Sequence, residues 1–400
     1  MRKIIALVMV LALCLTAVAA MADGIAKEDI KLGVILLHDE NSTYDLNFMN
    51  GAREAAAALG LSENQLQFYR NQPESSACAE TALDAVDEGC NIVFFDSYGH
   101  QFYTDDVVAG NPSVQFVHAT GDLAHLKEYP NLANAFATIY DGRYLAGIAA
   151  GMKLNEMKEA GKLKGDVPMM GYVGAYTYAE VVSGYTSFYL GAKSVCPDVQ
   201  MKVQFTGSWY DEKEEKAAAE ALIAAGCDLI SQHADSMGAP TACENAGVPN
   251  VCYNISTQAA CPNTYLIYSR INWEPYFEYL INQVIAGEPV DKDWVGTMET
   301  NSVMVTDLNE AVAAKGTQEA IDTAKAELLA GTRHVFDTAT EGFITVEGAA
   351  VAETWAPDDA AYNAEKDKVV YDGYFHESEF RSAPYFSIQI DGIELLNTKF

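Results

Sequence analysis

The sequence predicts an α/β protein with two similar open parallel-sheet lobes and a ligand cleft between them. From Ile30 onward, short apolar runs alternate with amphipathic stretches, which is the pattern of a parallel sheet covered by helices. The pattern occurs twice, because Gly33 and Gly89-Cys90-Asn91 match Gly171 and Gly226-Cys227-Asp228 at nearly the same spacing. The chain has 400 residues, more than the ~250 to 300 at which one core usually divides.

The N-terminal segment has the pattern of a secretory signal peptide covering residues 1–22. Arg2 and Lys3 precede the apolar run Ile4–Val18, and Ala20-Met21-Ala22 supplies small residues before a cleavage point. The run is shorter than the ~20 residues of a membrane-spanning helix. We therefore expect an exported protein, periplasmic or extracellular. A membrane tether through Cys14 stays open, although the preceding Leu13 argues against acylation there.

The chain is strongly acidic. Its formal net charge is −31, and removal of the two basic residues of the leader takes it to −33. Such a charge repels nucleic acid and anionic membranes, so neither is expected as a partner. Half of the residues are apolar, which indicates a folded globule with an acidic surface rather than a disordered chain.

Five strands are predicted in the first lobe, residues 23–140. A second series of five strands begins in the second lobe, residues 141–264, and its last strand follows that range directly. The first series is Lys31–Leu37, Leu66–Tyr69, Ile92–Phe95, Val114–Val117 and Ala133–Thr138. The second series is Met169–Val173, Lys202–Phe205, Leu229–Gln232, Val251–Asn254 and Tyr265–Tyr268.

Helices are predicted between the strands and at the lobe crossing. A capping box of Asp211 and Glu214 starts one helix, and Gly226 follows its end. The crossing helix begins near Asp141, where Gly142 and Gly147 allow close packing.

Later segments are expected to complete both lobes. They include a helix over Pro275–Ala286, a strand within Asn301–Val305 and a helix near Thr317–Leu329. A segment after about residue 265 returns to the first lobe, and parts of 300–400 complete the second. Residues 345–400 are a C-terminal extension whose role the sequence does not define.

Seven cysteines remain after the leader, and their pairing is left open. An exported location permits disulfides, but an odd number leaves at least one thiol free. Cys90 and Cys227 each begin an apolar strand, as small buried residues do. A pair among Cys243, Cys252 and Cys261 is one alternative; their spacing matches no metal motif.

Catalytic signatures are absent from the sequence. It contains no G-x-S-x-G, H-E-x-x-H, G-x-x-x-x-G-K or G-x-G-x-x-G after its first strand. We therefore expect neither an enzyme nor a bound cofactor or metal, and we expect a monomer.

Aromatic residues stand out near the predicted strand ends. Phe48 follows the first strand, Tyr98 the third, and Trp209 the second strand of the second lobe. Flat rings beside Asp, Asn and Ser suit a planar heterocycle, because stacking leaves the ring edges free for hydrogen bonds. Ordinary core packing is the competing interpretation. It is favoured for Tyr98, Tyr176 and Tyr178, and it has the same weight as ligand binding for Phe48 and Trp209.

Several segments, in order, resemble the basic membrane protein family of ABC-transporter substrate-binding proteins for purine nucleosides. The segments are Asp45-Leu46-Asn47-Phe48, Tyr140-Asp141-Gly142-Arg143-Tyr144-Leu145-Ala146-Gly147, Gly171-Tyr172-Val173-Gly174, Gly207-Ser208-Trp209-Tyr210-Asp211, Ala225-Gly226-Cys227-Asp228-Leu229-Ile230 and Asn272-Trp273-Glu274-Pro275-Tyr276. The resemblance spans roughly residues 30 to 340. It implies a type I periplasmic-binding-protein-like fold and a receptor that delivers a purine nucleoside or base to an ABC permease.

The resemblance also implies roles for six residues. Phe48 and Trp209 would sandwich the base, and Asp45 would position the first-lobe loop. Tyr98 is a further candidate. Asn254 stands where many members have an acid that grips the ribose, so a free nucleobase is an alternative to a nucleoside. Trp273 stands where many members have a lysine and offers a third candidate stacking surface.

Two other functions stay open at this stage. The same two-lobed receptor could present its closed form to a chemoreceptor or kinase. A nucleoside-processing enzyme is the third alternative. The sequence does not say which purine is bound or whether ribose is required.

Overall fold

The computed structural model describes residues 24–357, 362–363 and 367–399, and these fall into two compact units. Unit 1 comprises the described part of Met1–Glu40 together with Phe48–Phe136 and Trp273–Val295. Unit 2 comprises Asn41–Asn47, Ala137–Asn272 and the described part of Gly296–Phe400. The predicted signal peptide lies outside the described residues.

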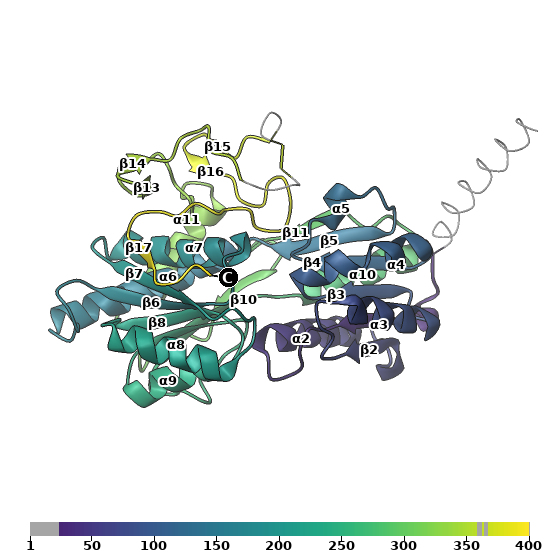
Figure 1. Cartoon of the computed structure of the whole chain (residues 1–400), viewed down its shortest axis with the longest axis horizontal. Helices are drawn as coiled ribbons and strands as arrows, with labels where there is room; N and C mark the ends of the chain where they lie inside the picture. The colour runs from purple at the N-terminus through teal and green to yellow at the C-terminus, as the bar shows by residue number, and fades with distance from the viewer. Residues whose placement is uncertain (1–23, 358–361, 364–366, 400) are drawn as a thin grey trace, which may run out of the picture. The chain divides into compact units, whose positions relative to one another are not determined.

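Unit 1 is built on a six-stranded sheet in the order β11-β5-β4-β3-β1-β2 (Figure 1). The strands are β1 Leu32–Ile35, β2 Leu66–Tyr69, β3 Ile92–Phe95, β4 Gln115–Ala119, β5 Leu132–Ala137 and β11 Asp293–Gly296. β1 pairs in parallel with β2 and β3, and β3, β4 and β5 follow in parallel. The five strands predicted from apolar runs are therefore confirmed, within two residues at each end.

Helices cover both faces of this sheet, and neighbouring phenylalanines of β3 serve opposite faces. The helices are α2 Thr43–Ala58, α3 Ser76–Asp87, α4 Asp105–Gly110, α5 Leu123–Leu126 and α10 Glu274–Ala286. Phe94 packs against Phe277 of α10, whereas Phe95 joins the cluster of Cys78 and Val107 from α3 and α4. Alternation of side chains along a strand explains this division.

Unit 2 is built on a seven-stranded sheet in the order β12-β10-β9-β8-β6-β7-β17. Its strands are β6 Met169–Gly174, β7 Gln200–Phe205, β8 Leu229–His233, β9 Asn250–Tyr253, β10 Tyr265–Ile271, β12 Val303–Thr306 and β17 Ile393–Leu395. β12 runs antiparallel to β10. β10 belongs to this second sheet, in agreement with the predicted second series of strands, and the chain returns to unit 1 at Trp273.

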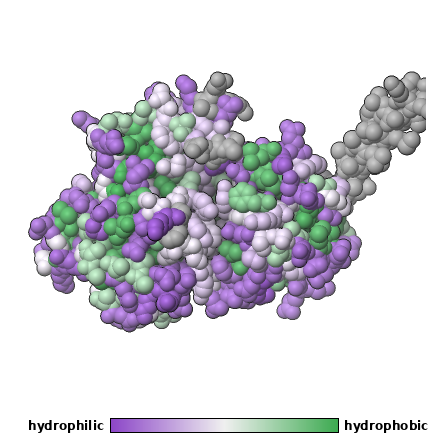
Figure 2. Space-filling model, viewed as in Figure 1, coloured by the Kyte–Doolittle hydropathy of each residue, from purple (hydrophilic) through white to green (hydrophobic). Residues whose placement is uncertain are grey.

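Helices also cover both faces of the second sheet. They are α6 Ile139–Glu159, α7 Ala179–Val195, α8 Glu212–Ala224, α9 Gly238–Ala246 and α11 Thr317–Leu329. In Figure 1, α6, α7 and α11 lie above the sheet, and α8 and α9 lie below it. Hydrophilic side chains dominate the surface where α8 and α9 lie (Figure 2), as the amphipathic sequence of α8 requires.

The packing of α6 on α7 depends on glycines. A side chain at Gly147 would collide with the carbonyl oxygen of Phe188, and one at Gly191 would collide with that of Tyr144. An added Cβ at Gly151 would lie 2.6 Å from Ala192 O. The close packing predicted for Gly147 is thus confirmed, and the helix backbones nearly touch.

The start of α8 differs in one residue from the predicted capping box. Asp211 accepts hydrogen bonds from the backbone N–H groups of Lys213 and Glu214, as an N-cap residue does. In the reciprocal hydrogen bond, Asp211 N donates to Glu215 Oε1 at 3.1 Å. The prediction that Glu214 completes the capping box was therefore wrong. Glu215 lies on the buried side of α8 and can reach back, whereas Glu214 is exposed.

The C-terminal extension belongs to unit 2. Its strand β17 pairs in parallel with β7, with Ile393 opposite Met201. Its apolar residues, among them Phe375 and Phe386, join the same core cluster as Tyr144 and Phe188. The segment therefore completes the sheet edge and covers the α6 and α7 face (Figure 1).

The seven cysteines of the described residues are buried free thiols. Cys90 and Cys227 occupy the apolar strand-start positions that the sequence predicted for small buried residues.

Candidate functional site

Polar and aromatic side chains converge where the parallel strands of unit 2 end. These strands have their carboxyl ends at Gly174, Phe205, His233, Tyr253 and Ile271. Ligands of open α/β sheets bind beyond such carboxyl ends. The residues that directly follow the strands are therefore the candidates for ligand contact.

Trp209 lies in a cluster of three aromatic rings after β6 and β7. Its ring centroid is 5.1 Å from that of Tyr176 and 6.0 Å from that of Tyr178. Tyr178 is 47% exposed, and Trp209 and Tyr176 are half-buried. The cluster thus offers partly open aromatic surface at the strand ends, whereas a fully packed core ring would offer none.

Asp235 and Asn254 meet after β8 and β9. Asn254 Nδ2 donates to Asp235 Oδ1 at 3.3 Å, and both side chains are buried. Asn254 has φ of 69°, a left-handed conformation that asparagine adopts more readily than most residues. Burial raises the pKa of the Asp235 carboxyl well above its usual range, and the nearby carboxylates of Glu215, Asp45 and Glu180 add to the rise.

Glu215 supports the same region from α8. Its carboxylate accepts from Ser236 N at 3.0 Å and holds the turn that carries Asp235. Burial raises the pKa of Glu215 to about 7, while the hydrogen bonds from Asp211 and Ser236 oppose the rise. Several carboxyl groups therefore share one low-dielectric region, which favours ligands that donate hydrogen bonds and disfavours anions.

Asp45 lies in the short segment Asn41–Asn47 that belongs to unit 2. It is 1% exposed and accepts a hydrogen bond from Ser42 Oγ at 2.5 Å. Thr43 N donates to Asp235 O at 2.8 Å, and Asn47 Nδ2 donates to Ile271 O at 2.8 Å. The structure thus brings Asp45 to the strand ends of unit 2 together with Asp235 and Asn254.

Phe48 and Trp273 lie in the core of unit 1. Their ring centroids are 4.3 Å apart in a stacked arrangement, and they are 0% and 1% exposed. Phe94 and Phe136 pack around Trp273. The structure shows core packing for both residues, and their predicted role in stacking on a ligand stays an untested prediction.

Tyr98 follows β3 in unit 1 and begins the short 3-10 helix η3, Tyr98–Tyr103. Its ring meets that of Phe102 edge to face, with centroids 5.5 Å apart. The preceding Ser97 and the following Gly99 both donate to Glu74 Oε1. Tyr98 is half-buried and belongs to unit 1.

Sequence reasoning missed two acidic residues of this region and one basic residue beneath it. Asp235 directly follows a predicted strand, so its position after β8 was a usable signal. Glu215 carries no such signal, because only the folded helix shows which acid turns inward. Arg143 is fully buried and donates to Ser231 Oγ at 2.8 Å and to Tyr172 OH at 3.1 Å.

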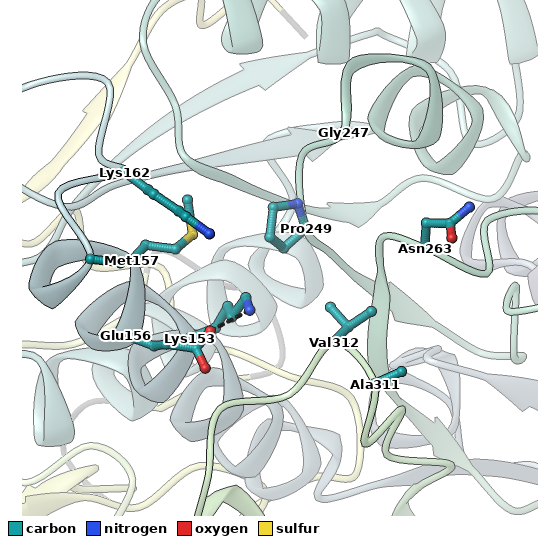
Figure 3. Close-up of a pocket in the computed structure, with 10 residues that line it drawn as sticks. Lys153, Glu156, Met157, Lys162, Gly247, Pro249, Asn263, Ala311 and Val312 are labelled. Carbon is teal, nitrogen blue, oxygen red and sulfur yellow. Dashed lines mark hydrogen bonds and ion pairs between the residues drawn. The ribbon is translucent and has the colours of Figure 1, made fainter.

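Two cavities of unit 2 lie away from these strand ends. One of about 380 Å³ is lined by Lys153, Glu156, Lys162 and Pro249, and Lys153 and Glu156 form an ion pair one turn apart on α6 at its wall (Figure 3). Pro249 immediately precedes β9, so this cavity is at the amino ends of the strands. A second of about 800 Å³ lies between α7 and the C-terminal extension, lined by Lys193 and Arg333 among others.

Among the described residues, no group of three or more His, Cys, Asp or Glu side chains is arranged to hold a metal ion. The part of the chain that the structure describes also contains no helix long and apolar enough to cross a membrane.

Three curated proteins are similar to this chain in sequence. A purine-binding protein of Brucella abortus is 32% identical over 63% of this chain and 68% of its own length. A putative ABC transporter glucose-binding protein of Haloferax volcanii is 29% identical over 65% and 63%. A nucleoside-binding ABC transporter protein of Lactococcus lactis is 27% identical over 58% and 63%. The aligned region thus spans about two thirds of each relative.

A solved structure shares the fold. An ABC transporter solute-binding protein of Conexibacter woesei has a TM-score of 0.61 with 20% identity, and the match covers 76% of this chain and 98% of that one. The model of the PnrA-like ABC transporter substrate-binding proteins matches residues 32–331, which include parts of both units and all six predicted site residues. The chain therefore belongs to the Bmp family of PnrA-like ABC transporter substrate-binding proteins.

Proposed function

We propose that this substrate-binding protein captures a neutral purine nucleoside or nucleobase and delivers it to an ABC permease. The observation that carries the proposal is the convergence of the half-buried Trp209 ring with the buried Asp235 and Asn254 at the strand ends of unit 2. An aromatic surface beside hydrogen-bonding groups matches a planar heterocycle with polar edges.

The charges of this region support a neutral ligand with donor groups. Asp45, Asp235 and Glu215 are carboxyl groups, so they accept hydrogen bonds from N–H and O–H groups. A purine offers ring and amino N–H groups, and ribose adds hydroxyls. The names of two relatives, purine-binding and nucleoside-binding, support the same ligand class.

In this proposal the residues predicted from the sequence do not contribute equally, and Tyr98 has no assigned role. Trp209 supplies the stacking surface, and Asp45 and Asn254 supply polar contacts. Asp235 supplies a further polar contact. Phe48 and Trp273 act through the packing of unit 1, in which both are buried. Export through the predicted leader and the permease partnership belong to the same proposal.

Identification of the ligand tests the proposal most directly. The purified protein is denatured and any released small molecule is identified by mass. The refolded protein is then titrated calorimetrically with adenosine, guanosine, inosine, the free bases and glucose. Binding of a purine without binding of glucose is expected. Binding of glucose alone would overturn the purine assignment, and the glucose-binding name of one relative makes this comparison informative.

The Trp209→Ala variant tests the proposed stacking surface. Loss of one stacked ring is expected to weaken purine binding by ~1 to 3 kcal/mol. Phe102→Ala is the control, because Phe102 is a 65% exposed aromatic residue of unit 1 and has no assigned role in the proposed site. An unchanged affinity in Trp209→Ala would remove this residue from the site.

A further inference from the structure

Two buried thiols meet beside the loop that carries Asn254. Cys252 is near the end of β9, and Cys261 follows the loop 254–260. Their sulfur atoms share two polar neighbours, the Asn250 amide oxygen and the Thr257 hydroxyl. The Thr257 hydroxyl lies 3.3 Å from Cys261 Sγ.

The surroundings hold the two sulfur atoms in one place. Asn250 Oδ1 lies 3.1 Å from Cys252 Sγ and 3.8 Å from Cys261 Sγ. The thiols share a small apolar cluster with Tyr265 and Tyr268. Cys78, Cys90, Cys196 and Cys227 are each buried as well, and the polar contacts recorded for them involve no second thiol.

We propose that Cys252 and Cys261 are a disulfide-forming pair, whose oxidation closes a covalent loop around residues 253–260 and fixes the Asn254 turn. The oxidant is a small-molecule disulfide, and the reaction is thiol–disulfide exchange. The proposal is independent of which ligand the protein binds.

The exchange balances in two steps. The Cys261 thiolate attacks one sulfur of the small disulfide, forms a mixed disulfide and releases one thiol. Cys252 then loses its proton and attacks Cys261 Sγ, which forms the internal disulfide and releases the second thiol. The two cysteines give up two electrons and two protons, and the small disulfide is reduced to two thiols.

The local chemistry favours Cys261 as the first nucleophile. The neighbouring Cys252 thiol and the hydrogen bonds from Thr257 and Asn250 lower the pKa of Cys261 below its usual range. Burial raises the pKa of Cys252 well above its usual range. A thiolate is the attacking species in exchange, so the pair divides naturally into an attacking and a resolving cysteine.

Access to Cys261 comes through the exposed turn before it. Gln258, Ala259 and Ala260 are exposed, and the backbone of Cys261 is held by a hydrogen bond to Thr257 O at 3.1 Å. Opening of this turn requires the loss of few buried contacts, so it is expected to occur more readily than global unfolding.

Peptide mapping of the folded protein tests the pair. The protein is incubated with oxidised glutathione, remaining thiols are blocked with iodoacetamide, and the peptides are analysed without reduction. A peptide linking Cys252 to Cys261 and lighter by about 2 Da is expected, because the pair loses two hydrogens. Its rate of formation should rise as the pH increases, because the thiolate is the attacking species. Hydrogen exchange in residues 253–260 should be slower in the oxidised protein than in the reduced one.

Single variants provide the controls. In Cys252→Ser, Cys261 should stop at the mixed disulfide with glutathione, whereas Cys227→Ser should leave the internal disulfide unchanged. Two results would overturn the proposal. In the first, iodoacetamide labels both Cys252 and Cys261 after the incubation with oxidised glutathione, and it labels them equally in a reduced, unfolded sample. In the second, the dominant disulfide links Cys261 to Cys243. Mapping of the unmutated chain gives either result even where a variant fails to fold.

Discussion

At the scale of single residues, burial separates side chains that maintain the fold from those that can meet a ligand. Phe48 and Trp209 are both aromatic and both follow strand ends in the sequence. Phe48 is fully buried against Trp273, whereas Trp209 is half-buried in an open aromatic cluster. The two residues are therefore expected to respond differently to truncation.

Phe48→Ala is expected to lower the free energy of unfolding by ~3 to 5 kcal/mol, because it removes a ring from a packed core and leaves a cavity. Urea titration followed by tryptophan fluorescence measures the effect. Phe102→Ala, at an exposed ring, should change it by less than about 0.5 kcal/mol. A Phe48→Ala protein as stable as the parent but with weaker purine binding would instead support the predicted ligand contact.

Glu215 is expected to make stability depend on pH. Its pKa is raised to about 7 by burial, above the ~4.3 of an unfolded glutamate. The folded state therefore binds a proton that the unfolded state has released, and this contribution to stability, fully present below about pH 4, is lost as the pH rises through 7.

The Glu215→Gln variant removes this titration. The free energy of unfolding of the parent, relative to that of the variant, should fall by about 2 to 3 kcal/mol between pH 4 and pH 8. Denaturant titrations at several pH values measure the difference. Glu214→Gln is the matched control, because Glu214 is exposed one residue earlier on the same helix. A parallel pH dependence of parent and Glu215→Gln would contradict the raised pKa.

At the scale of elements, the contact between α6 and α7 depends on the absence of side chains. Gly191 faces the backbone of Tyr144 so closely that a methyl group has no room. Gly191→Ala should force the two helices apart and lower the free energy of unfolding by ~1 to 3 kcal/mol.

Gly165→Ala is the control for this substitution. An added Cβ at Gly165 meets no atom within 4 Å, so the Gly165→Ala protein should be about as stable as the parent. Thermal unfolding of both variants measures the contrast. Equal melting temperatures for Gly191→Ala and Gly165→Ala would show that the helices can separate without cost.

At the scale of the whole molecule, charge selects among ligands. The chain carries a formal net charge of −31, and Asp45, Asp235 and Glu215 lie within the candidate site. These carboxyl groups would repel a phosphate, whereas a neutral nucleoside would not meet this repulsion.

Adenosine, guanosine or inosine should therefore raise the melting temperature, and the corresponding monophosphates should raise it far less at the same concentration. Stabilisation follows affinity by mass action and reaches ~2.7 kcal/mol at a hundredfold excess over Kd. Differential scanning fluorimetry at low salt gives the comparison, since the field is least screened there. Equal protection by a monophosphate would place an unrecognised positive group at the site.

The α/β class, the ten parallel strands and the family could all be predicted from the sequence. Apolar runs bounded by glycine predict strands, because a strand that is buried on both faces is apolar along its length. The repeated landmarks at Gly33 and Gly171 likewise predicted two similar sheets. These features depend on residues that are neighbours in the chain.

Which candidate site residues are buried, and which acidic side chains lie close together, became visible in the folded structure and not in the sequence. Phe48 and Trp209 look alike in sequence, but the partners that bury Phe48 include Trp273, more than two hundred residues away. Asp45, Asp235 and Glu215 likewise come from three distant segments. The raised pKa values of Asp235 and Glu215 arise from burial and from carboxyl groups brought near by folding. Burial and electrostatic coupling depend on distances in space, and no local pattern in the chain contains those distances.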